Sequence, residues 1–97
     1  MQIGQFFFEG PFFDLSKITD FGGLYAVVDE ENRIIDIGQS GQLRTRLMNH
    51  DRMPCWRNQT NGRYRVYILY TPNRSEAERL IIESRLRIAY NPPCGDR

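Results

Sequence analysis

The strongest constraint on the fold is a pair of β-rich runs at residues 23–28 and 33–38, separated by the polar segment 29–32. β-branched and aromatic side chains in both runs favour extended strands, and a short polar segment between two strands favours a tight reversal. The sequence therefore predicts an antiparallel β-hairpin. With the turn centred on the middle of the polar segment, Tyr25 is expected to lie opposite Asp36 or one place from it, near the open end of the hairpin.

Length and composition place this hairpin in an ordinary globular protein. The chain has 97 residues, of which 40% are hydrophobic and 26% are charged, a balance that excludes disordered, collagen-like and coiled-coil chains. We expect a single domain over residues 1–97. The longest apolar stretch, residues 6–13, is broken by Glu9, Gly10 and Pro11, so it predicts no membrane span, and no secretion signal is recognisable. These features predict an intracellular, cytoplasmic protein that does not associate with membranes.

The two cysteines are interpreted as free thiols. In a reducing compartment Cys55 and Cys94 are not expected to form a bridge. Together with His50 they offer three potential zinc ligands, but the paired Cys-x-x-Cys spacing typical of structural zinc sites is missing. The sequence therefore favours neither a disulfide nor a zinc site.

Charge is distributed unevenly along the chain. Residues 1–43 carry a net charge of −5, and the residues from Arg44 onward carry +6, with twelve arginines and a single lysine in the whole chain. The planar guanidinium group forms paired hydrogen bonds to phosphate and to carboxylate. The basic half is thus consistent with a phosphate-rich partner, and equally with ion pairs to the acidic half of the folded chain.

A helix is expected over residues 41–50, capped by the hydroxyl of Ser40. Two leucines form its buried stripe. Arg46 and His50 are four residues apart and share a face beside that stripe, which places a guanidinium and an imidazole at the rim of the core. A solvated polar pair at these positions is the alternative.

The segment 51–62 is predicted to be a loop, because it contains Pro54, two asparagines and a glycine. Trp56, beside Arg57, can stack on a nucleic-acid base, or it can anchor the loop to the core. The residues 64–70 combine aromatic and β-branched side chains and predict a strand that ends at a Thr-Pro-Asn sequence.

The last predicted element is a helix over residues 75–90, with Ser75 or Asn73 as its cap and two prolines beyond its end. One weakly polar to apolar face comprises Ala77, Leu80, Ile81, Ser84 and Ile88, and a second comprises Ile82, Leu86 and Ala89. Between them runs a charged stripe of Glu76, Arg79, Glu83 and Arg87. We interpret this stripe as the lining of a groove, in which two arginines hold a partly sheltered Glu83. An exposed ladder of ion pairs is the alternative.

An ordered set of motifs runs from Gly23 to Gly95. It comprises Gly23-Leu24-Tyr25, Asp36-Ile37-Gly38-Gln39-Ser40, Leu43, Arg46-Leu47, His50, and Glu83 followed by Leu86, Tyr90 and Pro92. In this order the motifs resemble those of the GIY-YIG nuclease domain family. The resemblance implies a small α/β (α+β) domain with a three-stranded antiparallel sheet flanked by helices.

The family resemblance also implies a function, the metal-dependent hydrolysis of DNA phosphodiester bonds in repair, recombination or defence. Tyr25 would then activate the attacking water or act as its general base. Arg46 would bind the scissile phosphate, and His50 would support the phosphate or help order the base. Glu83 would hold one divalent ion, Mg²⁺ or Mn²⁺, whose charge stabilises the phosphate and the leaving oxygen.

Two positions depart from the family pattern. Asp36 takes the place of the second-motif tyrosine, where it can accept a proton, bring a second carboxylate to the metal, or mark a site that has lost activity. Gly95 stands at about the place of an asparagine that often follows the terminal proline, although Asn91 is nearby. These departures favour an alternative function, a catalytically inactive module that binds nucleic acid or protein on the same fold.

DNA is the expected partner, and a protein partner can supply the specificity that the chain itself lacks. Contacts to nucleic acid are expected at Ser40, Arg44, Trp56, Arg57, Arg79 and Arg87. The phenylalanines of residues 6–13 are expected to pack on the sheet, or in part to form a dimer surface, and the sequence does not fix the oligomeric state.

Overall fold

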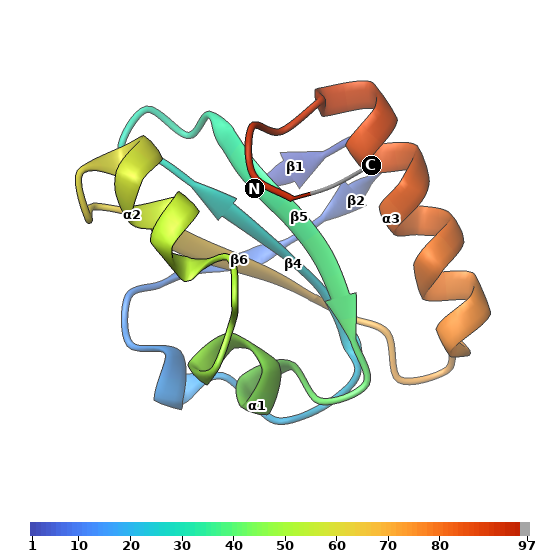
Figure 1. Ribbon diagram of the computed structural model, residues 1–97. Coiled ribbons are helices and arrows are strands. Elements are labelled where there is room, and N and C mark those ends of the chain that lie inside the picture. Colours follow the sequence, from blue (N-terminus) through green and yellow to red (C-terminus); the bar gives the residue numbers. More distant parts are fainter. Residues whose placement is uncertain (96–97) are drawn as a thin grey trace.

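The computed structural model describes residues 1–95, in which helices lie on both sides of a β-sheet (Figure 1). The elements in chain order are β1 (Gln2–Ile3), β2 (Phe6–Phe7), β3 (Glu9–Phe12), the 3-10 helix η1 (Leu15–Lys17), β4 (Gly23–Val28), β5 (Ile34–Ser40), α1 (Leu43–Met48), α2 (Met53–Thr60), β6 (Arg65–Tyr70) and α3 (Glu76–Tyr90). Strands β1 and β2 form a separate two-stranded sheet, and the main sheet has the order β3-β6-β4-β5. The expected mixture of helices with an antiparallel sheet is confirmed.

The three predicted strands of the main sheet are present, and a fourth strand extends it. β4 pairs with β5 in the predicted hairpin and with β6 on its other side, all antiparallel. The additional strand β3 contains Gly10 and Pro11, two residues that disfavour strands, and therefore gave no strand signal in the sequence. It lies at the edge of the sheet, where proline is tolerated because no further strand needs its missing N–H.

The register of the hairpin differs from the expectation. Tyr25 pairs with Gly38, and Asp36 pairs with Val27, so the turn is centred later in the chain than predicted. Asn32 takes a left-handed conformation with φ of 62°, which asparagine tolerates. A bulge between Val27 and the end of β4 shifts the pairing further. Turn geometry thus sets which side chain lies across from Tyr25.

The side chains of the sheet alternate between two hydrophobic cores. The core on the side of α1 and α2 contains Ile18, Tyr25, Val27, Ile35, Leu43, Leu47, Trp56, Val66, Ile68 and Cys94. The core on the side of α3 and the β1–β2 hairpin contains Ile3, Phe8, Leu24, Ala26, Val28, Ile37, Tyr67, Ile82 and Leu86. Tyr25 therefore belongs to the core that α1 and α2 cover.

The segment predicted to be a loop contains the helix α2. Pro54 lies in its first turn, where a missing N–H costs nothing, and Asn61 ends it in a left-handed conformation with φ of 54°. The proline and asparagine that indicated a loop are thus the start and stop signals of a short helix. Helix α1, in contrast, is shorter than predicted, because Ser40 is still part of β5, although its Oγ accepts from the Gln42 amide at 3.0 Å.

Helix α3 is confirmed, and Ser75 is its cap. Ser75 Oγ accepts from the Glu78 amide at 3.2 Å, and the Glu78 carboxylate accepts from the Ser75 amide at 2.9 Å, a reciprocal capping box. Of its two expected apolar faces, only the one with Ile82 and Leu86 is buried, because the three large residues of the other are exposed: Leu80, Ile81 and Ile88. No helix within residues 1–95 is long and apolar enough to cross a membrane.

The phenylalanines of residues 6–13 divide between the core and the surface. Phe8 is fully buried, whereas Phe7 and Phe13 are exposed. The expected packing therefore holds for only part of this stretch.

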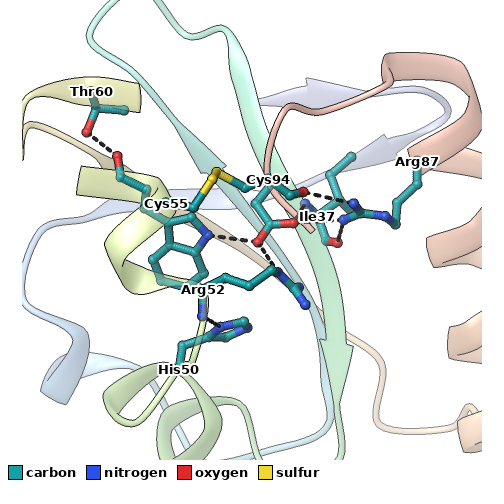
Figure 2. Close-up of a disulfide and its surroundings, with 9 residues drawn as sticks. Ile37, His50, Arg52, Cys55, Thr60, Arg87 and Cys94 are labelled. Atoms are coloured by element: carbon teal, nitrogen blue, oxygen red, sulfur yellow. Dashed lines mark hydrogen bonds and ion pairs between the residues drawn. A yellow bond between two sulfur atoms is a disulfide. The ribbon is translucent and has the colours of Figure 1, made fainter. Parts of the chain in front are cut away.

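The expectation of free thiols is wrong, because Cys55 and Cys94 form a disulfide (Figure 2). The bridge joins α2 to the segment that follows α3, and the two Cα atoms lie 5.9 Å apart, within the usual range for disulfides. A separation of 39 residues in sequence gave no sign of this proximity. Folding brings the two cysteines together, since Cys94 also pairs with β5 through its amide, which donates to Ile35 O at 3.0 Å.

Reduction of this disulfide is expected to lower the free energy of unfolding by about 2 to 4 kcal/mol, because the unfolded chain regains the freedom that the bridge removes. Urea unfolding with and without a thiol reductant measures the change. The Cys55→Ser/Cys94→Ser double variant serves as the control, since its stability should equal that of the reduced protein and should not respond to the reductant. Equal midpoints for the oxidised and reduced wild type would contradict this expectation.

Candidate functional site

The candidate site is built around Tyr25, the third residue of β4. Its phenol ring lies over Gly38 on the neighbouring strand β5, and a Cβ atom at position 38 would overlap the ring and its hydroxyl. The glycine of the second motif is thus required by the close approach of the tyrosine of the first. This packing fixes the direction in which the phenol points.

The Tyr25 hydroxyl lies between His50 and Arg52. His50 Nε2 contacts Tyr25 Oη, and Arg52 Nη2 donates to the same oxygen at 2.9 Å. His50 Nδ1 accepts from the backbone amide of Arg52 at 3.1 Å, so a neutral imidazole carries its proton on Nε2. The phenolic oxygen therefore accepts hydrogen bonds from two donors.

The imidazole of His50 is neutral at neutral pH. Its side chain is fully buried, and this burial, with the positive charges of Arg46 and Arg52, lowers the pKa of His50 to about 4. Its Nδ1 also lies 3.4 Å from Asp51 Oδ1, but a neutral ring forms no ion pair there. His50 thus acts in the site as a hydrogen-bonding group without charge.

The depressed pKa of His50 predicts a loss of stability in acid. The unfolded chain takes up a proton on this histidine near pH ~6.5 and the folded chain only near pH 4, so stability is complete above pH ~6.5 and falls as pH decreases through this window. Between about pH 7 and about pH 5 the loss is expected to be roughly 2 kcal/mol. Urea titrations across this range measure it, and the slope should flatten in His50→Gln. An unchanged slope in that variant would assign the acid sensitivity to other groups.

Burial raises the pKa of Tyr25 above its ordinary value. The positive charges of Arg52 and Arg46 lower it, and the negative charges of Asp36 and Glu83 raise it further. Four charged side chains, from β5, α1, the start of α2 and α3, therefore act on one hydroxyl. Among them are Arg46 and Glu83, which the sequence predicted to share a site with Tyr25.

Glu83 lies on α3 and is half-buried. Its burial raises the pKa of the carboxyl group, and the charges of Arg87 and Arg52 and the backbone amide of Gln39 oppose this shift. The expectation that Arg79 and Arg87 hold Glu83 is wrong. Arg79 Nε donates to Gln39 Oε1 at 3.0 Å, and Arg87 Nη1 donates to Asp36 Oδ1 at 2.7 Å. The Glu83 carboxylate consequently has no ion pair among residues 1–95.

Arg46 lies on α1 at the surface of the site. Its side chain is 38% exposed, and Nη2 donates to the exposed carboxylate of Asp51 at 2.9 Å. An ion pair at this exposure contributes little to stability, so an incoming anion can compete with Asp51 for the guanidinium. The geometry leaves Arg46 available to a phosphate.

Asp36 is fully buried, and its two oxygens accept four hydrogen bonds. Oδ1 accepts from the Ile37 amide at 2.8 Å and from Arg87 Nη1 at 2.7 Å, and Oδ2 accepts from Arg52 Nε and Trp56 Nε1, both at 2.7 Å. Arg52 and Arg87 therefore bind different oxygens of this carboxylate. Four hydrogen bonds thus occupy both oxygens of the carboxylate in this structure, which disfavours a direct bond from Asp36 to a metal ion.

Two of the six residues expected to contact nucleic acid are part of the interior. Trp56 is fully buried with its indole N–H bound to Asp36, so it cannot stack on a base. Arg87 is also buried, and its Nη2 donates to Cys94 O at 2.8 Å. The other four retain accessible surface, with Arg44 and Arg57 exposed and Ser40 and Arg79 half-buried.

Arg52 is the site residue that the sequence interpretation missed. It lies at the start of α2, in the segment predicted to be a loop, and it belongs to none of the motifs. The one local signal is its position two residues after His50, which allows its amide to reach the imidazole. Its side-chain partners, Asp36 and Tyr25, are 16 and 27 residues away in sequence.

The residues around Tyr25 suit a metal ion that is held largely by water and substrate. No group of three or more potential ligands from His, Cys, Asp and Glu occurs in the part of the chain that the structure describes. Mg²⁺ commonly uses one or two protein carboxylates and completes its shell with water and phosphate oxygens. The half-buried Glu83, without an ion pair among the described residues, fits this role.

Comparison with known protein sequences finds a relative of this chain. The chain is 33% identical over 90 residues to UvrABC system protein C from Methanothermobacter thermautotrophicus, an alignment that covers 87% of this chain. The chain spans only 15% of the length of that relative. No family model matches the chain.

Comparison with solved structures identifies the fold. Two structures of the GIY-YIG N-terminal endonuclease domain of UvrC from Thermotoga maritima, both point mutants bound to a catalytic divalent cation, superpose with a TM-score of 0.67. Each is 18% identical in sequence, and the match covers 86% of this chain and 91% of the other. The chain therefore has the fold of that domain.

Proposed function

Because this chain has the fold of a GIY-YIG nuclease domain, we propose that it is a DNA endonuclease that hydrolyses phosphodiester bonds with the help of a divalent cation. DNA repair is the setting that the similarity to UvrC favours among repair, recombination and defence. The observation that carries the proposal is the environment of Tyr25, whose hydroxyl receives hydrogen bonds from two donors and faces the charges of Arg46 and Glu83. Hydrolysis of a phosphodiester requires such a convergence of a base, a cation and a metal ligand.

In the proposed reaction Tyr25 acts as the general base in its phenolate form. The oxygen of the attacking water forms the new bond to phosphorus, its proton passes to Tyr25 Oη, and the bond to the leaving oxygen breaks. The leaving oxygen then takes a proton from water. His50 and Arg52 hold the phenolic oxygen in place and stabilise the negative charge on it.

Arg46 and Glu83 complete the proposed site. The guanidinium of Arg46 binds the scissile phosphate through charge-assisted hydrogen bonds. Glu83 holds Mg²⁺ or Mn²⁺, and the bound cation supplies charge stabilisation for the phosphate and the leaving oxygen. General acid–base catalysis contributes about 10² to 10⁴-fold, so most of the acceleration must come from electrostatics and positioning.

A second candidate function is a binding module without catalytic activity. Tyr25 is only 1% exposed, and Asp36, in the place of the second-motif tyrosine, is occupied by four donors. Both features restrict the access of water to the site. In an endonuclease, contacts that form in the substrate complex would restore this access.

Cleavage assays with wild-type protein separate the two functions. Supercoiled plasmid, branched DNA and single-stranded DNA are incubated with Mg²⁺ or Mn²⁺, and in parallel with excess chelator. An endonuclease converts at least one substrate to nicked or shortened products only when the cation is present. If all substrates stay intact but the protein binds DNA in a mobility-shift assay, the endonuclease proposal is wrong and the binding module is supported. Absence of both cleavage and binding would contradict both functions.

A further inference from the structure

We propose that Arg52 is a positioning residue for the base oxygen of Tyr25, and that Asp36 contributes to the reaction by holding Arg52. The inference rests on the proposed endonuclease function and extends it to a residue outside the sequence motifs. It also gives Asp36 a role that requires neither a free proton site nor a metal bond.

The geometry of Arg52 links three groups of the site. Its Nη2 donates to Tyr25 Oη at 2.9 Å, its Nε donates to Asp36 Oδ2 at 2.7 Å, and its backbone amide donates to His50 Nδ1 at 3.1 Å. A guanidinium group is planar and rigid, so the bond to the buried Asp36 carboxylate also fixes the direction of Nη2. Arg52 thus aligns both the phenol and the imidazole that contacts it.

Arg87, the second arginine that binds Asp36, has a structural role and provides a comparison for Arg52. The side chain of Arg87 is 9% exposed, and its remaining bonds within residues 1–95 go to the carbonyl oxygens of Ile37 and Cys94. The side chain of Arg52 is 27% exposed and reaches the hydroxyl at the centre of the site. Arg87 therefore stabilises the buried core, whereas Arg52 connects the buried Asp36 to the Tyr25 hydroxyl.

Arg52 also opposes the effect of burial on Tyr25. The groups that face the phenol are Arg52 and Arg46, which favour the phenolate, Asp36 and Glu83, which disfavour it, and the neutral His50. Since burial leaves the pKa of Tyr25 raised, the phenolate is the minor form at neutral pH. The cleavage rate is consequently expected to increase with pH, and loss of Arg52 should displace this profile to higher pH.

The first test measures the pH profile of cleavage in Arg52→Gln and Arg52→Lys. At a given pH, Arg52→Gln is expected to cleave about 10 to 10³-fold more slowly than wild type, which corresponds to a displacement of about 1 to 3 pH units. Arg52→Lys, which keeps the charge, should be displaced less. Arg87→Lys is the control for a disturbance of Asp36. Arg63→Gln is the control for the loss of a positive charge, because Arg63 is exposed and pairs with Glu30 at 3.5 Å. Both controls should keep the wild-type profile position.

A second measurement does not depend on cleavage. Fluorotyrosine, which has a more acidic phenol than tyrosine, is incorporated into the folded protein, and the ¹⁹F resonance of residue 25 is assigned by its loss in Tyr25→Phe. The ionisation of this phenol is expected to move to higher pH in Arg52→Gln and less in Arg52→Lys. An unchanged ionisation in a folded Arg52→Gln variant would overturn the inference. A displaced ionisation without cleavage of any DNA by wild type would support the role of Arg52 and contradict the endonuclease.

Discussion

Replacement of Glu83 by Gln is expected to reduce metal-dependent DNA cleavage by about 10³-fold, because the amide retains the shape of the side chain and loses the charge that binds the cation. The expected loss corresponds to several kcal/mol of transition-state stabilisation. The fold should be retained, since Glu83 is half-buried and has no ion pair among the residues that the structure describes. The measurement is the rate of plasmid nicking over a range of Mg²⁺ and Mn²⁺ concentrations.

Glu76→Gln is the matched control for this experiment. It removes the same charge from the same helix at an exposed position in the first turn. Cleavage by Glu76→Gln should remain within a few-fold of wild type. If Glu83→Gln cleaved as fast as this control, Glu83 would not be the metal ligand, and the proposed mechanism would be wrong.

Replacement of Asp36 by Ala is expected to lower the free energy of unfolding by about 3 to 5 kcal/mol. The substitution removes the acceptor of two guanidinium groups and of the Trp56 indole N–H, and it leaves the positive charge of the buried Arg87 without this carboxylate. Removal of one partner from a buried ion pair has a large cost, because the remaining charge keeps its desolvation penalty. Urea unfolding of the oxidised protein measures the effect.

Glu30→Ala provides the comparison on the surface. Glu30 pairs with Arg63 at 3.5 Å, and both side chains are exposed. The expected loss of stability is about 0 to 1 kcal/mol. A loss below about 1 kcal/mol for Asp36→Ala as well would show that the hydrogen bonds of Asp36 do not hold α2 and α3 against β5.

The network around Asp36 gives a physical account of the departure at the second motif. A carboxylate at this position binds Arg52, just before α2, and Arg87, in α3. The Cys55–Cys94 disulfide joins α2 covalently to the segment that follows α3. One of these arginines then reaches Tyr25. Asp36, which stands in the place of the second-motif tyrosine, thus holds Arg52 in the position from which Arg52 donates to the Tyr25 hydroxyl.

The hairpin, the strand β6 and the helix α3 could be predicted from sequence, because each depends on local patterns. The β-branched and aromatic residues of β4 and β5 and the helix cap at Ser75 involve residues close in the chain. The predicted shared helix face of Arg46 and His50 is wrong, because α1 ends at Met48, and His50 is buried beyond that end while Arg46 stays partly exposed. The motifs indicated Tyr25 and Glu83, and in the structure the negative charge of Glu83 contributes to the raised pKa of the Tyr25 phenol.

Contacts between distant parts of the chain were decided by tertiary structure alone. Asp36 meets Arg87 across 51 positions and Trp56 across 20, and Cys55 meets Cys94 across 39. Local composition carries no record of such pairings, so Trp56 and Arg87 were expected among the contacts to nucleic acid and the cysteines were expected to be free. Which donors surround a buried carboxylate depends on how helices pack against the sheet. The sequence by itself therefore determined the strands β4, β5 and β6, the helix α3 and the motif residues. Packing determined Arg52 as a partner of Tyr25 and Asp36 as the support of Arg52.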